Sequence, residues 1–187
     1  GVADWNRCRG SLVTQLFLTG KPVLLGGDGN RRKLPRKAFI LAAWLLLERP
    51  DSSMTRQEAA RLLWDGTDAT RLAGNMRQLI LRIAEEQRIG GFELFSFGSD
   101  DLSVRVDQFD VDVRHLVDAP AIRDGNELRR LCDYHRGDVL LGGEDGSVKL
   151  VNWLRPMRTK LKSDFAALVS SYLEGHGDAL AIEDALA

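Results

Sequence analysis

Four polar residues between positions 70 and 87 have types and spacings that suit hydrogen bonding to nucleic-acid bases. The segment is expected to be a helix, and at about 100° per residue four side chains fall nearly on one line: Arg71, Asn75, Gln78 and Arg82. The apolar residues are expected on the opposite side: Leu72, Met76, Leu79, Ile80 and Ile83. Arginine can pair bidentately with guanine, and Asn or Gln with adenine, in a groove wide enough to admit a helix. The line therefore indicates a recognition helix, and the alternative is a solvated helix face.

Two shorter helices are expected before this one. The first begins near Pro35 and stops before Pro50, and it is apolar nearly all round. The second opens with a capping box formed by Thr55 and Glu58. The third ends before a Gly-Gly pair, after which residues 92–97 and 102–106 alternate polar and apolar side chains around a Gly-Ser-Asp-Asp turn. That alternation predicts a β-hairpin.

Basic residues near the helix starts are the candidates for phosphate contacts. Arg36 and Lys37 lie at the entry to the first helix. Arg56 lies in the first turn of the second helix, where free backbone N–H groups and the positive end of the dipole also attract phosphate. Arg31 and Arg32 could touch phosphate or end a solvated strand, and the strand end is favoured because phosphate contacts depend on docking geometry.

The remaining segments predict short strands first and helices later. Residues 14–34 alternate polar and apolar side chains and contain a Gly-rich run at 26–30, which favours strands joined by tight turns. A phosphate cradle is the alternative for the Gly-rich run, but the run lacks the Lys-Ser/Thr ending of a P-loop. From Phe109 onward the pattern predicts only helices, at 111–117, 126–135 and 151–173, with a last helical piece after Gly177.

Composition and charge bound the class of protein. The chain has 187 residues, 44% hydrophobic and 28% charged, enough for one or two globular domains. The net charge of −1 is uneven: residues 1–107 carry 16 Lys and Arg against 13 Asp and Glu (+3), and residues 108–187 carry 10 against 14 (−4). This suits a DNA-binding part joined to a protein-contact part, and the alternative is ordinary fluctuation in surface charge. The link near Gln108 is short and lacks Gly, Ser and Pro, so the two halves are expected to pack as one unit.

No catalytic, metal or cofactor site is predicted. Cys8 and Cys132 lie far apart, and Cys132 with His135 supplies too few ligands for a metal ion. The three histidines have no pattern around them that suggests a nucleophile with its base. The longest apolar run, residues 38–47, is half of the roughly 20 residues that span a bilayer. With so few cysteines, a reducing cytoplasm is the expected setting.

The order of these motifs resembles that of SARP-like bacterial regulators, which carry an OmpR/PhoB-type winged-helix DNA-binding domain. Residues 34–82 look like the family's basic pair before a Leu/Ala-rich helix, its Thr-Arg-x-Glu and Leu-Leu-Trp motifs, and the recognition-helix core Met76-Arg77-Gln78. Gly91-Phe92-Glu93-Leu94 is similar to the entry to the family's wing. The second half resembles the bacterial transcriptional activator domain (BTAD) in the stretches FDVDV (109–113) and YHRGDVLLG (134–142), in Trp153-Leu154 with Arg158, and in a repeat-like GDALAI (177–182).

The resemblance implies an α+β fold in two domains. Residues 12–107 would be a winged helix-turn-helix domain, and residues 108–187 an all-α, tetratricopeptide-like domain that is incomplete here, because the family's version usually continues further. It also implies a sequence-specific transcription regulator, an activator, with residues 70–87 in the major groove and Arg77 among the DNA contacts. The expected partners are double-stranded DNA, RNA polymerase and a second protomer on repeated half-sites.

Two departures from the family leave a second hypothesis open. The wing tip carries Asp100 and Asp101, which phosphate would repel, and Ala84 stands where many relatives have a basic residue. A protein-interaction or scaffold module that no longer binds DNA is therefore the competing hypothesis. Binding to DNA that weakens steeply with salt would separate the two.

Overall fold

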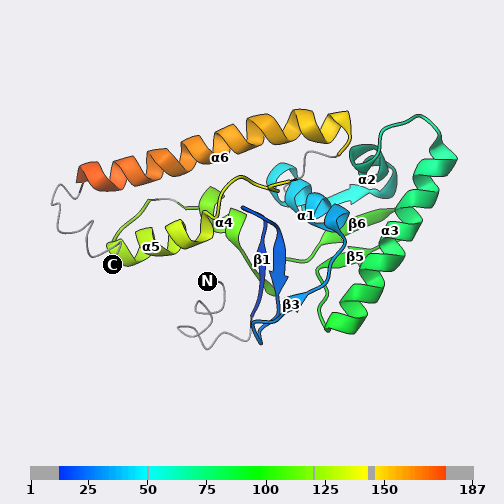
Figure 1. The fold of residues 1–187 in the computed structure, drawn as a ribbon, viewed down its shortest axis with the longest axis horizontal. Helices are drawn as coiled ribbons and strands as arrows, with labels where there is room; N and C mark the ends of the chain where they lie inside the picture. Colours follow the sequence, from blue (N-terminus) through cyan, green and yellow to red (C-terminus); the bar gives the residue numbers. More distant parts are fainter. Residues whose placement is uncertain (1–12, 50, 120, 143–145, 176–187) are drawn as a thin grey trace.

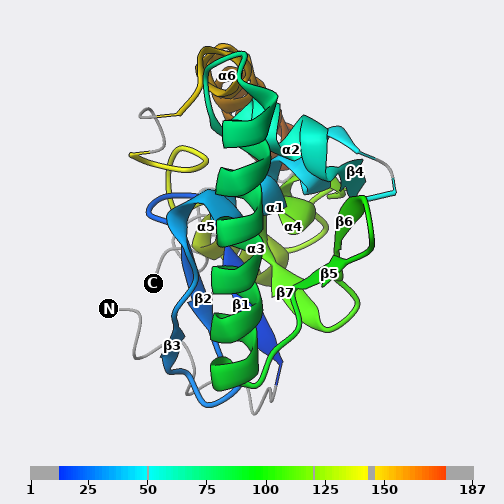
Figure 2. The ribbon, with the colours of Figure 1, turned by 90° about the vertical axis from the view of Figure 1, so that its right-hand side faces the viewer.

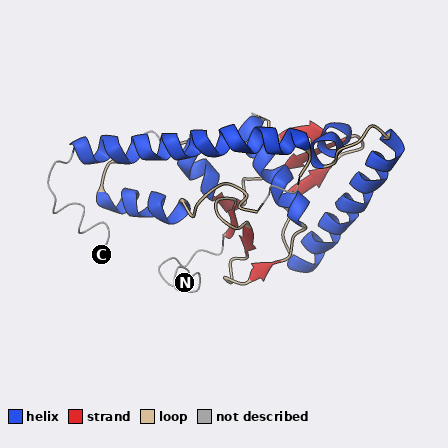
Figure 3. Ribbon diagram, turned by 45° about the horizontal axis from the view of Figure 1, so that its top comes forward, coloured by secondary structure: helices blue, strands red, loops and turns tan. Residues whose placement is uncertain are grey.

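The computed structural model describes residues 13–49, 51–119, 121–142 and 146–175, and their fold mixes α and β structure, as the sequence predicted. The molecule is elongated, with helices and one small sheet at one end, another small sheet near the middle, and helices alone at the other end (Figure 1). The longest helix, α6 (Val148–Gly175), runs along the top over both parts. Figure 3 shows the same arrangement, in which the strands lie away from the C-terminal end of α6.

The first sheet has the strand order β3-β2-β1-β7. Its strands are β1 (Thr14–Phe17), β2 (Val23–Leu25), β3 (Arg31–Arg32) and β7 (Phe109–Val111). The Gly-rich run forms the β2–β3 turn, in which Gly26 N–H donates to the Asn30 carbonyl over 2.9 Å, so the hairpin turn is confirmed. β7 pairs parallel with β1, with Val111 beside Leu16. The prediction of an all-helical second half was therefore wrong at 109–111, because these residues form the edge strand of the first sheet.

The three helices predicted between residues 35 and 90 are confirmed. They are α1 (Arg36–Glu48), α2 (Arg56–Leu63) and α3 (Ala69–Gly90). The α2 capping box forms as predicted: Thr55 Oγ1 accepts from the Glu58 N–H, and the Glu58 carboxylate accepts from the Thr55 N–H. The Asp68 side chain caps α3, and Gly91, with φ of 67°, ends it in the left-handed conformation that favours glycine.

A second, three-stranded sheet has the order β4-β6-β5. Its strands are β4 (Ser53–Thr55), β5 (Phe95–Phe97) and β6 (Asp101–Val104). The predicted hairpin at 92–106 is confirmed as β5 and β6, with Ser96 opposite Ser103. β4 was not predicted, since three residues between two helices are too few to show an alternating pattern. It holds the hairpin against α2 by pairing Met54 with Leu102.

The helical part contains α4, α5 and α6, close to the three predicted helices. The first two are α4 (Asp112–Val117) and α5 (Gly125–Tyr134). The helical piece expected after Gly177 lies outside the described residues. Within the described part of the chain, no helix has the length and the apolar character needed to cross a membrane.

One hydrophobic core joins the two halves of the chain, as expected from the short link between them. It contains residues from the first half, such as Leu41 and Ile83, and residues from the second, such as Leu150 and Leu154. The indole rings of Trp44 in α1 and Trp153 in α6 lie 4.9 Å apart and pack on this core. The packing therefore fixes α6 on the three-helix end of the molecule.

Candidate nucleic-acid interface

Helix α3 lies on the outside of the molecule with one face open. In Figure 2 it stands alone in front, with the β2–β3 segment on one side and the β5–β6 hairpin on the other. Its buried side chains share one face: Leu72, Met76, Leu79, Ile83 and Gln87. The rest of the helix surface is free to contact a partner.

Gln87 fixes the far end of α3 against the hairpin. Its amide donates to the Phe95 carbonyl over 3.1 Å and accepts from the Phe95 N–H over 2.7 Å, both in buried surroundings. A buried amide satisfied on both sides is rigid, because losing either bond would leave a polar group unpaired. Gln87 therefore links the end of α3 to the hairpin by two buried hydrogen bonds.

The predicted polar line on α3 lies to one side of the exposed face. Arg71, Gln78 and Arg82 are exposed, and Asn75 is half-buried. At about 100° per residue, the line is about 110° from the middle of the buried face, not 180°. The prediction of a line directly opposite the core was therefore wrong. Arg77 is also exposed and, by the same periodicity, lies on the other side of the helix from Arg82, which lines the groove next to β3.

Gly74 and Leu81 occupy the part of α3 that points directly away from the core. A side chain added at Gly74 would meet nothing within 4 Å, and Leu81 is 57% exposed. Neither residue was predicted from the sequence, although an apolar residue such as Leu81 outside the apolar face of a helix is a usable sign of a contact surface. A leucine at this position could contact the methyl group of thymine in a major groove.

Arg56 forms hydrogen bonds to the β5–β6 hairpin through both its backbone and its side chain. Its backbone N–H donates to the Asp100 carbonyl over 2.8 Å, and its guanidinium Nη2 donates to the Gly98 carbonyl. Its Nε is buried. The residue predicted to touch phosphate at the start of α2 is thus a link between α2 and the β5–β6 turn, with only part of its guanidinium open to a ligand.

Lys37 also points inward. Its Nζ donates to the Leu63 carbonyl over 2.8 Å and lies 4.8 Å from the centre of the Trp64 ring. Burial, and then the nearby charge of Arg36, lower the pKa of Lys37. The ammonium group thus satisfies the C-terminal end of α2, where a positive charge is favourable. Its neighbour Arg36 is exposed.

The turn of the β5–β6 hairpin is acidic and exposed. Asp100 and Asp101 both lie at its tip, where the Gly98 N–H donates to the Asp101 carbonyl over 3.1 Å. Phosphate groups would be repelled from this tip. The exposed basic side chains of α3 therefore lie beside an acidic hairpin.

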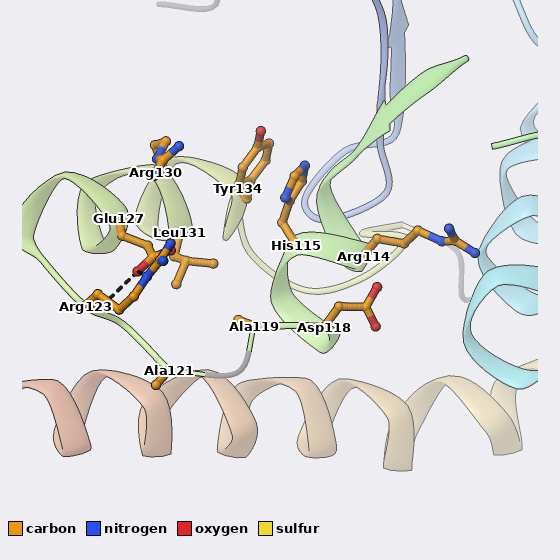
Figure 4. A pocket seen from close by; sticks show the side chains of 10 residues that line it. All are labelled: Arg114, His115, Asp118, Ala119, Ala121, Arg123, Glu127, Arg130, Leu131 and Tyr134. Carbon is orange, nitrogen blue, oxygen red and sulfur yellow. Dashed lines mark hydrogen bonds and ion pairs between the residues drawn. The ribbon is translucent and has the colours of Figure 1, made fainter. Parts of the chain in front are cut away.

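A pocket of about 430 Å³ lies between α4 and α5, in the helical part of the molecule (Figure 4). On one wall Arg123 pairs with Glu127 over 3.0 Å, and on the other the His115 and Tyr134 rings stack 4.1 Å apart. Arg114 points away from the hollow in Figure 4. The lining residues include no Ser, Thr or Cys, and the Asp110–His115 pair lies beside the pocket.

No group of three or more potential metal ligands occurs among the described residues. Of the pair considered in the sequence, Cys132 is exposed, and the His135 ring stacks on Phe165 at 4.3 Å. The comparisons with protein-family models and with curated protein sequences find no match for this chain.

Proposed function

We propose that this chain is a sequence-specific transcription regulator that binds double-stranded DNA by placing α3 in the major groove. The observation that carries the proposal is the open face of α3, which presents Arg71, Gln78 and Arg82 beside the exposed Leu81. These are the side-chain types that can read guanine, adenine and thymine edges. A major groove about 12 Å wide admits a single helix of this kind.

The elements around α3 support an interpretation as a winged helix-turn-helix. Helices α2 and α3 follow each other through the short loop 64–68, and the β5–β6 hairpin follows α3 directly. In such domains the second helix of the pair enters the major groove while the first crosses the backbone. The rigid Gln87–Phe95 contact would hold the hairpin at a fixed place beside the DNA.

We assign protein contacts to the helical part, interpreted as tetratricopeptide-like, with a second protomer or RNA polymerase as the partner. This assignment is supported by the hydrogen bonds that join the start of α6 to α2 and to the loop that follows it. Ser147 Oγ donates to the Leu62 carbonyl, and the Val148 N–H donates to the Asp65 carboxylate over 3.1 Å. A partner on α6 would therefore act directly on the loop between α2 and α3.

The test is selection of bound fragments from a genomic DNA pool, followed by a salt titration of the best fragment. The proposal expects enrichment of one motif and an affinity that falls steeply as salt rises, because phosphate contacts release counterions. No enrichment, together with no salt-dependent binding, would contradict it.

A scaffold or protein-interaction module is the second candidate, and the acidic hairpin tip is the observation that favours it. Asp100 and Asp101 would weaken any DNA complex that needs the tip near phosphate. This candidate expects a stable protein complex whose formation is unaffected by excess duplex DNA. Competition between DNA and that protein for α3 would instead support the DNA-binding proposal.

A further inference from the structure

A groove of about 800 Å³ runs along one side of α3, between the C-terminal half of that helix and the segment from β2 to the start of α1. Arg31, Arg32 and Lys33 line one wall, and Leu81 and Arg82 line the other. This is the side of α3 that carries the polar line. The groove is therefore continuous with the face that we propose enters the major groove.

Two of the basic side chains on the first wall are free to bind an anion. Arg32 is paired with Asp28 over 3.0 Å, and hydrogen bonds from Asn30 and then Arg32 lower the pKa of Asp28 to about 2. Arg31 and Lys33 are exposed, and neither has an acidic partner among the described residues. The interpretation as a solvated strand end therefore fits Arg32. Arg31 and Lys33 instead carry two positive charges that no acidic side chain among the described residues neutralises.

The acidic groups of the groove lie toward the end of α3. Glu85 is paired with Arg88 over 2.8 Å, and Glu86 is half-buried. Glu85 and Glu86 line the same groove as Arg31, Lys33 and Arg82, and because Glu85 is paired, the three basic residues outnumber Glu86 there. The hairpin on the opposite side of α3 ends in Asp100 and Asp101 instead. The exposed Arg77 of α3 lies on that side too, so the acidic character there is confined to the hairpin turn.

We propose that Arg31, Lys33 and Arg82 hold the sugar-phosphate backbone on the β3 side of α3, and that the β5–β6 hairpin stays off the phosphates. The inference rests on the proposed function. A helix in the major groove has one phosphate strand on each side. The strand on the β3 side meets these three residues, and on the other side the exposed Arg77 of α3, not the acidic hairpin tip, faces the second strand. Backbone contacts of this kind set the register of the protein on the duplex but carry no base preference.

The experiment compares the double variant R31A/K33A with the matched control R130A/K160A, both in the 187-residue chain. The control removes the same charge from exposed positions on α5 and α6, away from α3. Affinity for the selected duplex is measured as a function of salt. Each lost phosphate contact removes about 0.9 units from the slope, so the R31A/K33A slope should be roughly 1.8 units shallower than that of the parent, and the control slope should be unchanged.

Two further variants complete the test. R31K/K33R keeps the charges and should restore the parent slope, which a packing role would not predict. D100N/D101N neutralises the hairpin tip and should leave the slope and affinity nearly unchanged, because the tip does not approach phosphate. A large gain in affinity with D100N/D101N would place the hairpin against the backbone and overturn the inference.

The outcomes separate the inference from the function on which it rests. If the parent chain shows no salt-dependent binding to any duplex, both are overturned. If the affinity of the parent falls steeply with salt and R31A/K33A has the same salt slope as the control, the DNA-binding proposal stands. Only the proposed backbone contact on the β3 side is then overturned.

Discussion

Thr19 and Asp112 are joined by a buried hydrogen bond that links the two parts of the molecule. Thr19 Oγ1 lies 2.7 Å from Asp112 Oδ2 and 2.6 Å from the carbonyl oxygen of Tyr134, and all three groups are buried. The single hydroxyl proton can serve only one of these neighbours. Both contacts are satisfied when Thr19 donates to Tyr134 and a protonated Asp112 donates to Thr19. Asp112 also accepts from the Leu18, Thr19 and Val113 N–H groups, which ties β1 to α4.

The stability of the chain should therefore depend on the protonation of Asp112. Burial raises the pKa of Asp112 to about 6, against hydrogen bonds from Thr19 and Leu18 that lower it. The pKa of Asp112 in the folded state is above the unfolded value of about 3.9. Its contribution to the free energy of unfolding is therefore complete below about pH 4 and is lost as pH rises through about 6. The stability advantage of the parent over D112N, from denaturant unfolding, should shrink by on the order of 2–3 kcal/mol between pH 4 and pH 7. Parallel curves for the two proteins would contradict this account.

Arg56→Ala should destabilise the β5–β6 hairpin, in contrast to a substitution at an exposed phosphate contact. The change removes the hydrogen bond from the guanidinium to the Gly98 carbonyl, at a cost of about 1 kcal/mol. The measurement is amide hydrogen exchange, which should become faster at residues 98–104 and stay the same in α5. R61A, which truncates an exposed arginine on the same helix, is the control. Unchanged exchange in the hairpin would show that Arg56 does not support it.

Trp153→Phe should lower stability without altering base preference. Its Nε1 donates to the Glu48 carboxylate over 2.6 Å, and its ring packs on Trp44. Loss of the donor costs about 1 kcal/mol, because the hydrogen bond is to a charged group but is exposed to solvent. Thermal unfolding gives the stability, and selection from a random duplex pool gives the preference. An unchanged melting temperature with an altered motif would assign this indole to DNA contact instead.

Leu81 should read a thymine methyl group. Replacing thymine by uracil at the position that Leu81 contacts should weaken binding of the parent, and L81A should not distinguish the two duplexes. L81A itself should stay within about 0.5 kcal/mol of the parent in stability, because the side chain is exposed. If L81A and the parent show the same thymine-to-uracil effect at every position, Leu81 does not contact the methyl group.

Helix positions could be predicted from the sequence because the determinants are local. The Thr55–Glu58 capping box depends on a few neighbouring residues and forms as expected. Helix α3 ends at the expected Gly pair, but it runs through Gly90 and does not stop before it. β4 and β7 could not be predicted, because each has three residues and depends on partners about 50 and 95 positions away, in β6 and β1. Short strands of this kind are set by tertiary pairing.

The candidate site was predictable only in part. Sequence shows which residues are basic but not which backbone carbonyls they meet, and so it could not show that Lys37 donates to Leu63 or Arg56 to Gly98. The direction of the α3 polar line was predictable, since 100° per residue already places it about 110° from the apolar residues of the helix. Arg71, Gln78 and Arg82 are exposed as the helical periodicity predicted.

The central claim is that the exposed side of α3 reads bases in the major groove, and Gln78→Ala tests it most directly. Affinities of the parent and of Q78A are measured for the selected duplex and for every single-base-pair substitution of it. Q78A should lose about 1–3 kcal/mol on the selected duplex and lose its preference at one base pair only, while S170A, an exposed control on α6, keeps the parent profile. A folded Q78A protein with the affinity and base preferences of the parent at every position would contradict the claim.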